Sequence, residues 1–234
     1  MKRFWQQVTV APDAAGLCAV LLDGQSLKTP AGKDCLCPTL ALAEAVAVEW
    51  RGVKDKIDPV AMPMTQLTVT ALDLISVQRV AVIDQIMAYA DTDLLCYRTT
   101  DPPELAARQA AMWQPYLDWS ARQCDAVLKV TTGVRHIEQD AAARKALHQA
   151  VAAYDDFRLT ALQNAVNITG SLILGVAFVM RWRDAAAIFE AAELDATYQI
   201  ERWGADAEAV VRQEMVKADL VILDKFISCL ALPL

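Results

Sequence analysis

The sequence has little of what most catalytic and metal-binding sites require. It contains two histidines, His136 and His148, although histidine is the commonest general base and metal ligand. Gly170 and Gly175 precede no Lys-Ser/Thr pair, as a phosphate loop would require. Gly170-Ser171 also lacks the glycine pattern of a nucleophile elbow. We therefore expect no catalytic residue, no bound cofactor and no metal ion.

The six cysteines are irregularly spaced, and Cys35-Leu36-Cys37 is the one close pair. A thioredoxin-type motif needs two intervening residues, and a zinc knuckle needs a second pair of ligands. We interpret the cysteines as reduced thiols, since nothing in the sequence directs the chain to an oxidising compartment.

Basic residues are outnumbered, with 22 Lys and Arg against 29 Asp and Glu, which gives a net charge of −7. This balance argues against binding to nucleic acid, which usually requires a basic face. The stretch 184–219 has nine acids against three bases and so carries −6 of the −7. A hydrophobic content of 55% indicates a folded chain.

No segment is convincing as a membrane anchor. The charge-free stretch Leu159–Met180 has the length of a spanning helix, but polar residues interrupt it and only residues 168–180 are strongly apolar. That shorter length is typical of a buried core helix. The start, Met1-Lys2-Arg3, leads into no apolar stretch of signal-peptide length. We expect a cytoplasmic protein that is not embedded in a membrane.

The first part of the chain has the pattern of strands with one helix. Short β-prone runs lie at residues 4–10 and 17–22, and Asp23-Gly24 is typical of a hairpin turn. Thr39 is placed as the N-cap of an amphipathic helix that ends near Gly52.

Pro59 and Pro63 restrict the backbone and mark the best candidate boundary. Beyond them the periodicity predicts helices at 65–75, 77–90, 103–123, 140–154, 157–182, 184–202 and 206–230. The predicted fold class is α+β, with a small, β-rich N-terminal α+β domain at residues 1–63 and a larger all-helical domain at 64–234.

The tryptophans divide into two groups. Trp50, Trp113 and Trp119 have the helical spacing of core residues, whereas Trp5 and Trp203 adjoin polar residues and are candidates for exposed anchors.

Eight sequence blocks occur in the same order in a known family. They are Arg3-Phe4-Trp5; Leu22-Asp23-Gly24 with Leu27-Lys28-Thr29-Pro30; Ala45-Val46-Ala47 with Glu49-Trp50; Met62-Pro63-Met64-Thr65; Thr92-Asp93-Leu94-Leu95-Cys96-Tyr97-Arg98; Trp113 with Pro115 and Trp119; Gly170-Ser171-Leu172; and Gln199 to Glu208 with Trp203-Gly204. In these blocks the chain resembles the ATP-twelve family of assembly chaperones for the F-type ATP synthase catalytic head.

The resemblance implies a chaperone without catalysis of its own. Such a protein holds the unassembled alpha subunit until the beta subunit replaces it, and it is a monomer before the client binds. An unassembled subunit exposes an apolar interface that aggregates unless it is covered. The resemblance also implies a bacterial, cytoplasmic member, whose eukaryotic relatives act in the mitochondrial matrix.

Two other classes of function make similar demands on the sequence. One is a small cytosolic enzyme that acts through acids such as Asp91, Asp93 or Glu208, and the other is a helical interaction scaffold. An enzyme should bring polar groups with perturbed pKa values into a concave pocket, whereas a chaperone should present a broad apolar or acidic face.

For the chaperone we predict a partner-binding surface on the acidic C-terminal helices, where the charge concentrates and Trp203 precedes the break at Gly204. Its candidate residues are Glu193, Glu201, Trp203, Asp206 and Glu208.

Overall fold

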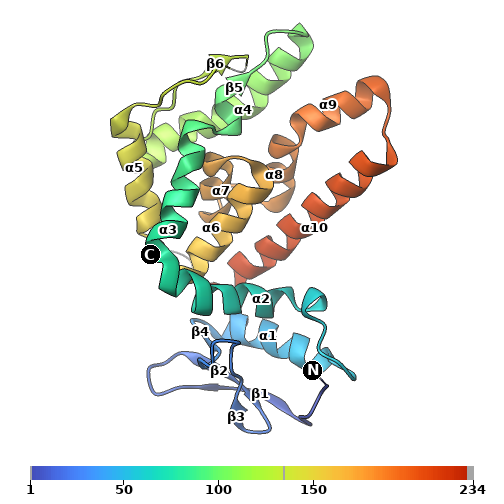
Figure 1. Ribbon diagram of the computed structural model, residues 1–234. Coiled ribbons are helices and arrows are strands. Elements are labelled where there is room, and N and C mark those ends of the chain that lie inside the picture. Colours follow the sequence, from blue (N-terminus) through green and yellow to red (C-terminus); the bar gives the residue numbers. More distant parts are fainter. Residues whose placement is uncertain (1, 134, 231–234) are drawn as a thin grey trace. The chain divides into compact units, whose positions relative to one another are not determined.

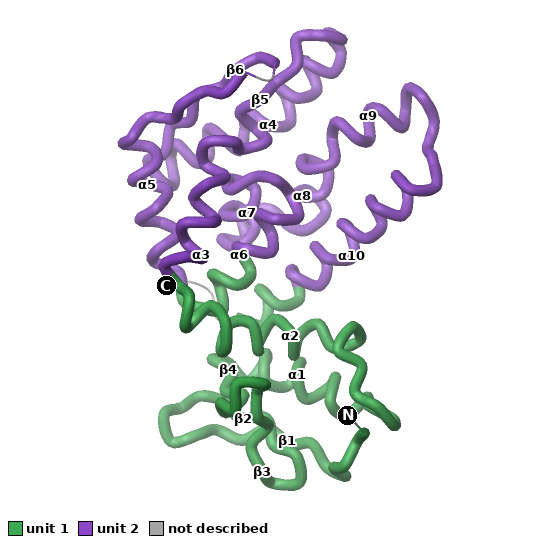
Figure 2. The backbone as a smooth tube through the Cα atoms, viewed as in Figure 1, with its two compact units in different colours: residues 1–79, 155–161, 225–234 green, residues 80–154, 162–224 purple. Residues whose placement is uncertain are grey.

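The computed structural model describes residues 2–133 and 135–230, and it has the predicted fold class (Figure 1). A small strand-containing region comes first and a larger helical part follows it. The chain forms two compact units, coloured separately in Figure 2. Unit 1 comprises residues 1–79, 155–161 and 225–234, and unit 2 comprises residues 80–154 and 162–224. The predicted domains were 1–63 and 64–234, whereas unit 1 continues to residue 79 and includes two segments distant in sequence, 155–161 and 225–234.

The sheet of unit 1 is antiparallel, and β2 (Cys18–Leu22) pairs with its three other strands. These are β1 (Val8–Pro12), β3 (Gln25–Ser26) and β4 (Leu36–Cys37). The hairpin turn is confirmed, because Asp23 and Gly24 have φ angles of 50° and 83°.

The exposed position predicted for Trp5 is wrong. Strand β1 begins at Val8, so Trp5 precedes it, and the indole is only 2% exposed. Its ring packs against Trp50, with 4.9 Å between the ring centroids. Polar neighbours in the sequence therefore did not indicate where this side chain points.

Helix α1 (Leu40–Gly52) covers the sheet, and its predicted start is confirmed. Thr39 Oγ1 accepts a hydrogen bond from the amide of Leu42 at 3.1 Å, as an N-cap does. The buried side chains recur at helical spacing and form the apolar face toward the strands. They are Leu42, Ala43, Val46, Ala47 and Trp50.

A broken helical run follows α1. It begins with a short 3-10 turn, η1 (Pro59–Ala61), and continues through α2 (Pro63–Val69), a π-helical segment, η2 (Thr70–Ile75), and α3 (Ser76–Ala88). The helical run from Pro63 to Cys96 is long and apolar enough to cross a membrane, and 28% of its most apolar window is buried. Length and composition are the only grounds for this, and core helices of other proteins pass the same test. This run is therefore weak evidence for a membrane span.

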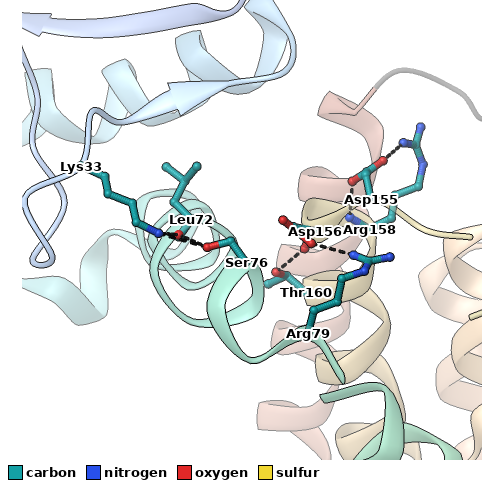
Figure 3. A network of polar contacts seen from close by, with 8 residues as sticks. All are labelled: Lys33, Leu72, Ser76, Arg79, Asp155, Asp156, Arg158 and Thr160. Atoms are coloured by element: carbon teal, nitrogen blue, oxygen red, sulfur yellow. Dashed lines mark hydrogen bonds and ion pairs between the residues drawn. The ribbon is translucent and has the colours of Figure 1, made fainter. Parts of the chain in front are cut away.

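Polar contacts hold the π-helical segment (Figure 3). Lys33 Nζ donates to the carbonyl oxygen of Leu72 and to Ser76 Oγ, the latter at 3.1 Å, and Ser76 Oγ also donates to the Leu72 carbonyl. One turn later Arg79 Nη1 lies 2.6 Å from Asp156 Oδ1. Lys33 and Ser76 thus supply hydrogen-bond donors to the Leu72 carbonyl in the irregular backbone.

Unit 2 is built mainly from helices. The first elements are η3 (Tyr89–Asp91), η4 (Leu94–Cys96), β5 (Tyr97–Arg98), α4 (Pro103–Cys124), β6 (Thr131–Thr132) and α5 (Ala141–Ala152). The remaining ones are α6 (Asp156–Thr169, which begins in unit 1), α7 (Leu172–Val179), α8 (Ala185–Ala192), α9 (Leu194–Trp203) and α10 (Ala207–Cys229, which ends in unit 1). Strands β5 and β6 pair in parallel over two residues, a local departure from the all-helical prediction.

All eight residues of α7 are buried, so the interpretation of residues 168–180 as a core segment is confirmed. The single helix predicted over 157–182 is wrong, because the chain breaks between α6 and α7. Gly170 has a φ angle of 67°, and Ser171 Oγ caps α7 by accepting a hydrogen bond from the amide of Leu174 at 3.0 Å. Gly170 thus ends one helix and Ser171 begins the next.

Candidate partner-binding surface

The predicted surface residues extend from Glu193, just before α9, through α9 and the turn after it to the first turn of α10 (Figure 1). Trp203 ends α9 with 78% of its surface exposed, so it is not a core residue. Gly204 then takes a φ angle of 87° and separates the helices. Asp206 Oδ1 accepts a hydrogen bond from the amide of Ala209 at 2.7 Å, as an N-cap does.

Glu193 is not on the surface, contrary to the prediction, since only 5% of the residue is exposed. It lies between α8 and α9, and its Oε1 accepts a hydrogen bond from Arg212 Nη1 of α10 at 2.9 Å. The second guanidinium nitrogen contacts the other oxygen, and this pairing raises the pKa of Arg212. A buried carboxylate needs such a partner, so Glu193 anchors α10 within unit 2.

Glu201 is exposed, but its charge is compensated by α4. Arg108 Nη1 lies 2.6 Å from Glu201 Oε2, and Arg108 Nη2 lies 3.0 Å from Glu104 Oε1. Arg202 approaches Glu104 Oε2 at 3.4 Å, and its Nε donates to the hydroxyl of Tyr198 at 3.0 Å. Two arginines thus balance two glutamates, and this exposed network orients α9 against α4 more than it adds stability.

Glu208, in the first turn of α10, is the acid of the predicted set that keeps its charge available. It is exposed, and within residues 2–133 and 135–230 it makes no ion pair. The acidic surface is therefore smaller than the sequence count suggested, because Glu193 and Glu201 have internal partners and Asp206 caps a helix.

Exposed apolar side chains accompany these acids, and sequence reasoning missed them. Val211 and Met215 are 59% and 62% exposed and lie one helical turn apart on α10. Val210 and Val221 are also exposed. The spacing of Val211 and Met215 was visible in the sequence, but the sequence could not show that this side of the helix lacks a partner. Trp203, Glu208, Val211 and Met215 are exposed residues of α9 and α10, here together named the α9–α10 surface.

A hollow of about 600 Å³ lies between α4, α8 and α9. Met112, Phe189 and Leu194 contribute apolar walls, and Arg108 lines it while pairing with Glu201. Tyr116 also lines the hollow; its hydroxyl donates to the carbonyl of Ala187 at 3.1 Å, and burial raises its pKa to about 12. This hollow suits an apolar group better than a reacting polar one.

Two of the three acids considered for catalysis, Asp91 and Asp93, have structural partners, whereas Glu208 has no ion-pair partner among the described residues. Asp93 is fully buried, and its carboxylate accepts hydrogen bonds from Ser171 Oγ at 2.7 Å and from the amides of Leu95 and Ile173 at 3.0 Å. Burial raises its pKa to about 6, although these bonds oppose the rise. Asp91 Oδ2 lies 3.3 Å from a guanidinium nitrogen of Arg144.

No group of three or more His, Cys, Asp or Glu side chains is placed to hold a metal ion among the residues that the structure describes. His136 and His148 are both exposed.

Comparison with known proteins identifies the family. The model of the ATP12 chaperone protein family matches residues 2–121. The crystal structure of Atp12 from Paracoccus denitrificans is 38% identical, covers 97% of each chain and superposes with a TM-score of 0.93. The Atu1473 protein of Agrobacterium tumefaciens is 35% identical over 98% of this chain and 86% of its own, with a TM-score of 0.91.

A more distant relative is protein atp12, mitochondrial, of Schizosaccharomyces pombe, which is 23% identical over 92% of this chain and 78% of its own. The predicted resemblance is therefore confirmed: this chain belongs to the ATP12 chaperone family.

Proposed function

We propose that this chaperone of ATP synthase assembly binds the unassembled alpha subunit through the α9–α10 surface and releases it when the beta subunit takes its place. It performs no catalysis. The observation that carries the proposal is Trp203, a large aromatic residue that is 78% exposed at the end of a helix. Exposed tryptophans are uncommon on free surfaces and are enriched at the centres of protein interfaces.

The surroundings of Trp203 support this role. Val211 and Met215 extend the apolar area, and Glu208 adds a negative charge next to it. An apolar client surface would be removed from water by packing against Trp203, Val211 and Met215. Glu208 would favour a client whose apolar surface is bordered by basic residues.

The same features argue for a chaperone rather than an enzyme or a rigid scaffold. The oxygens of Asp93 are occupied by three hydrogen-bond donors, which leaves it without a free face for a substrate. A scaffold needs no single exposed aromatic anchor, whereas transient capture of an apolar interface does.

The proposed compartment rests on the similarity to bacterial proteins and on the place where the client is synthesised. The two bacterial proteins are 35% and 38% identical to this chain, whereas the mitochondrial protein of Schizosaccharomyces pombe is 23% identical. We expect this chain to act as a monomer in the bacterial cytoplasm, where the alpha subunit would be synthesised.

The test uses purified alpha and beta subunits with Trp203→Ala and a matched control. Val60→Ala removes another highly exposed side chain, 87% exposed, from unit 1. Wild type and Val60→Ala should capture the alpha subunit, and added beta subunit should displace them. Trp203→Ala should bind about 30-fold more weakly, as the loss of an anchor worth about 2 kcal/mol predicts.

Each contrary result has a separate meaning. Capture of the beta subunit in place of the alpha subunit would overturn the client assignment. Unchanged affinity of Trp203→Ala would place the contact elsewhere, and a lower melting temperature of this variant would show that Trp203 supports the fold instead.

A further inference from the structure

Four of the six cysteines gather in unit 1, although the sequence separates them widely. Cys18 lies in β2, Cys37 lies in β4, and Cys35 directly precedes β4. Cys229 is the last residue of α10. The hydroxyl of Thr39 donates to the carbonyl oxygen of Cys229, which brings the end of α10 beside the residues that follow β4. The fold thus concentrates thiols that showed no functional spacing in the sequence.

Cys18 and Cys37 are directly opposite each other in the antiparallel pair of β2 and β4. Opposite residues in such a pair have Cα atoms about 4.5–5.5 Å apart and side chains on the same face. A disulfide requires a Cα separation of roughly 4.4–6.8 Å. The two cysteines can therefore be joined without a rearrangement of the strands.

Cys35 is the third member of the group. It lies two residues before Cys37, and the two thiols share a hydrogen bond. This bond lowers the pKa of Cys35 and raises the pKa of Cys37, to which burial adds. Cys35 is thus an alternative partner for Cys37.

Access differs among these thiols. Cys35 and Cys37 are completely buried, whereas Cys18 is half-buried and can meet a small solute from solvent. Cys229 is also half-buried, but only Cys18 lies opposite Cys37 in a strand pair, so a reaction that starts from solvent and ends at Cys37 begins at Cys18.

We propose that Cys18 and Cys37 form a reversible disulfide when the protein meets a hydroperoxide. The Cys18 thiolate attacks the terminal peroxide oxygen, which breaks the O–O bond, leaves a sulfenic acid and releases an alkoxide, or hydroxide when the oxidant is hydrogen peroxide. The Cys37 sulfur then attacks the Cys18 sulfur and forms the S–S bond, and the sulfenic oxygen leaves as water with the proton of Cys37. Overall, two thiols are oxidised by two electrons and one hydroperoxide is reduced; with hydrogen peroxide the products are the disulfide and two waters.

The competing pair is Cys35 with Cys37. Cys35 directly precedes β4 and its thiol is hydrogen-bonded to that of Cys37, but both thiols are buried and neither meets the oxidant first. The opposite pair across the strands lies within the range for a disulfide and includes the accessible thiol, so it should form first.

The experiment treats the reduced full chain with hydrogen peroxide and digests it with trypsin without reduction. The mass of the intact chain should fall by two hydrogens, and peptide 4–28 should be joined to peptide 34–51. Fragmentation between Cys35 and Cys37 should place the link on Cys37. The oxidised chain should melt about 5 °C higher, because the bond closes a loop of the unfolded chain, and dithiothreitol should reverse this shift.

Two variants provide the comparison. Cys18→Ala removes the half-buried thiol and should abolish both the link and the rise in melting temperature. Cys124→Ala removes a half-buried cysteine of unit 2 and should leave both unchanged. A Cys35–Cys37 link, oxidation of Cys18 that stops at a sulfinic acid, or a two-hydrogen loss that persists in Cys18→Ala would overturn the proposal.

Discussion

Ser171 Oγ donates a hydrogen bond of 2.7 Å to Asp93 Oδ1, across 78 residues of sequence and with neither residue exposed to solvent. The same serine oxygen accepts from the amide of Leu174 and so caps α7, while Asp93 caps η4 through the amide of Leu95. One carboxylate therefore fixes the starts of two helical segments in unit 2. This explains why a charged residue lies within an apolar core.

Asp93 should make stability depend on pH. Its pKa rises from 3.8 to about 6 in the folded chain, so the folded state retains the proton between these values while the unfolded state has released it. Stability should therefore fall as pH rises from 4 toward 7, by roughly 3 kcal/mol from this residue, since each pKa unit corresponds to about 1.4 kcal/mol.

Urea unfolding at several pH values measures this slope. Asp93→Asn should flatten it, and Asp219→Asn, a change at an exposed acid of α10, should not. An equal slope in wild type and Asp93→Asn would refute the assignment.

Gly175 should not tolerate a side chain. A Cβ atom there would lie 2.7 Å from Val166 Cγ2 and 3.0 Å from Leu162 Cδ1, both on α6. Gly175→Ala should lower the free energy of unfolding by about 1–3 kcal/mol because the packed helices would have to separate. Gly52→Ala is the control, since a Cβ at Gly52 meets nothing within 4 Å. Calorimetry measures the stability of both variants. A loss in Gly175→Ala alone indicates crowding, whereas an equal loss in both would indicate a general effect of replacing glycine in a helix.

Removing the partner of Glu193 should destabilise unit 2. Arg212→Ala leaves a buried carboxylate without its guanidinium, and we expect a loss of about 1–2 kcal/mol, reduced because Arg212 itself is half exposed. The double variant Glu193→Gln with Arg212→Ala should recover part of this loss, since an amide is cheaper to bury than a charge. Thermal unfolding measures the cycle, and additive losses would contradict a direct pairing.

Charge reversal at Glu208 should change the rate of association with the alpha subunit more than the equilibrium affinity. Because the Glu208 charge has no ion-pair partner among the described residues, Glu208→Lys should slow binding of the alpha subunit and weaken the dependence of the association rate on salt. Glu138→Lys reverses another exposed acid, in unit 2 but outside the α9–α10 surface, and should change neither. Stopped-flow measurements at low and high ionic strength would test this, and equal rates would exclude steering by Glu208.

Local sequence patterns were enough to predict the elements whose causes are local. Thr39 starts α1 because its hydroxyl caps the amides that follow, and Asp23-Gly24 turns the hairpin because both residues adopt positive φ angles. The apolar run that contains α7 had to be buried whatever its neighbours. The motifs likewise identified the family, because they occur in a fixed order along the whole chain and can be recognised without knowledge of any tertiary contact.

Which polar and aromatic residues remain exposed to a partner depends on the tertiary structure. Glu193 and Trp203 both belong to the acidic stretch, yet one is buried against Arg212 and the other is exposed. Trp5 and Trp203 both adjoin polar residues, yet Trp5 packs against Trp50. Cys18 and Cys37 meet only because β4 pairs with β2. Each outcome depends on a partner distant in sequence, and local patterns of charge or hydropathy carry no information about that partner.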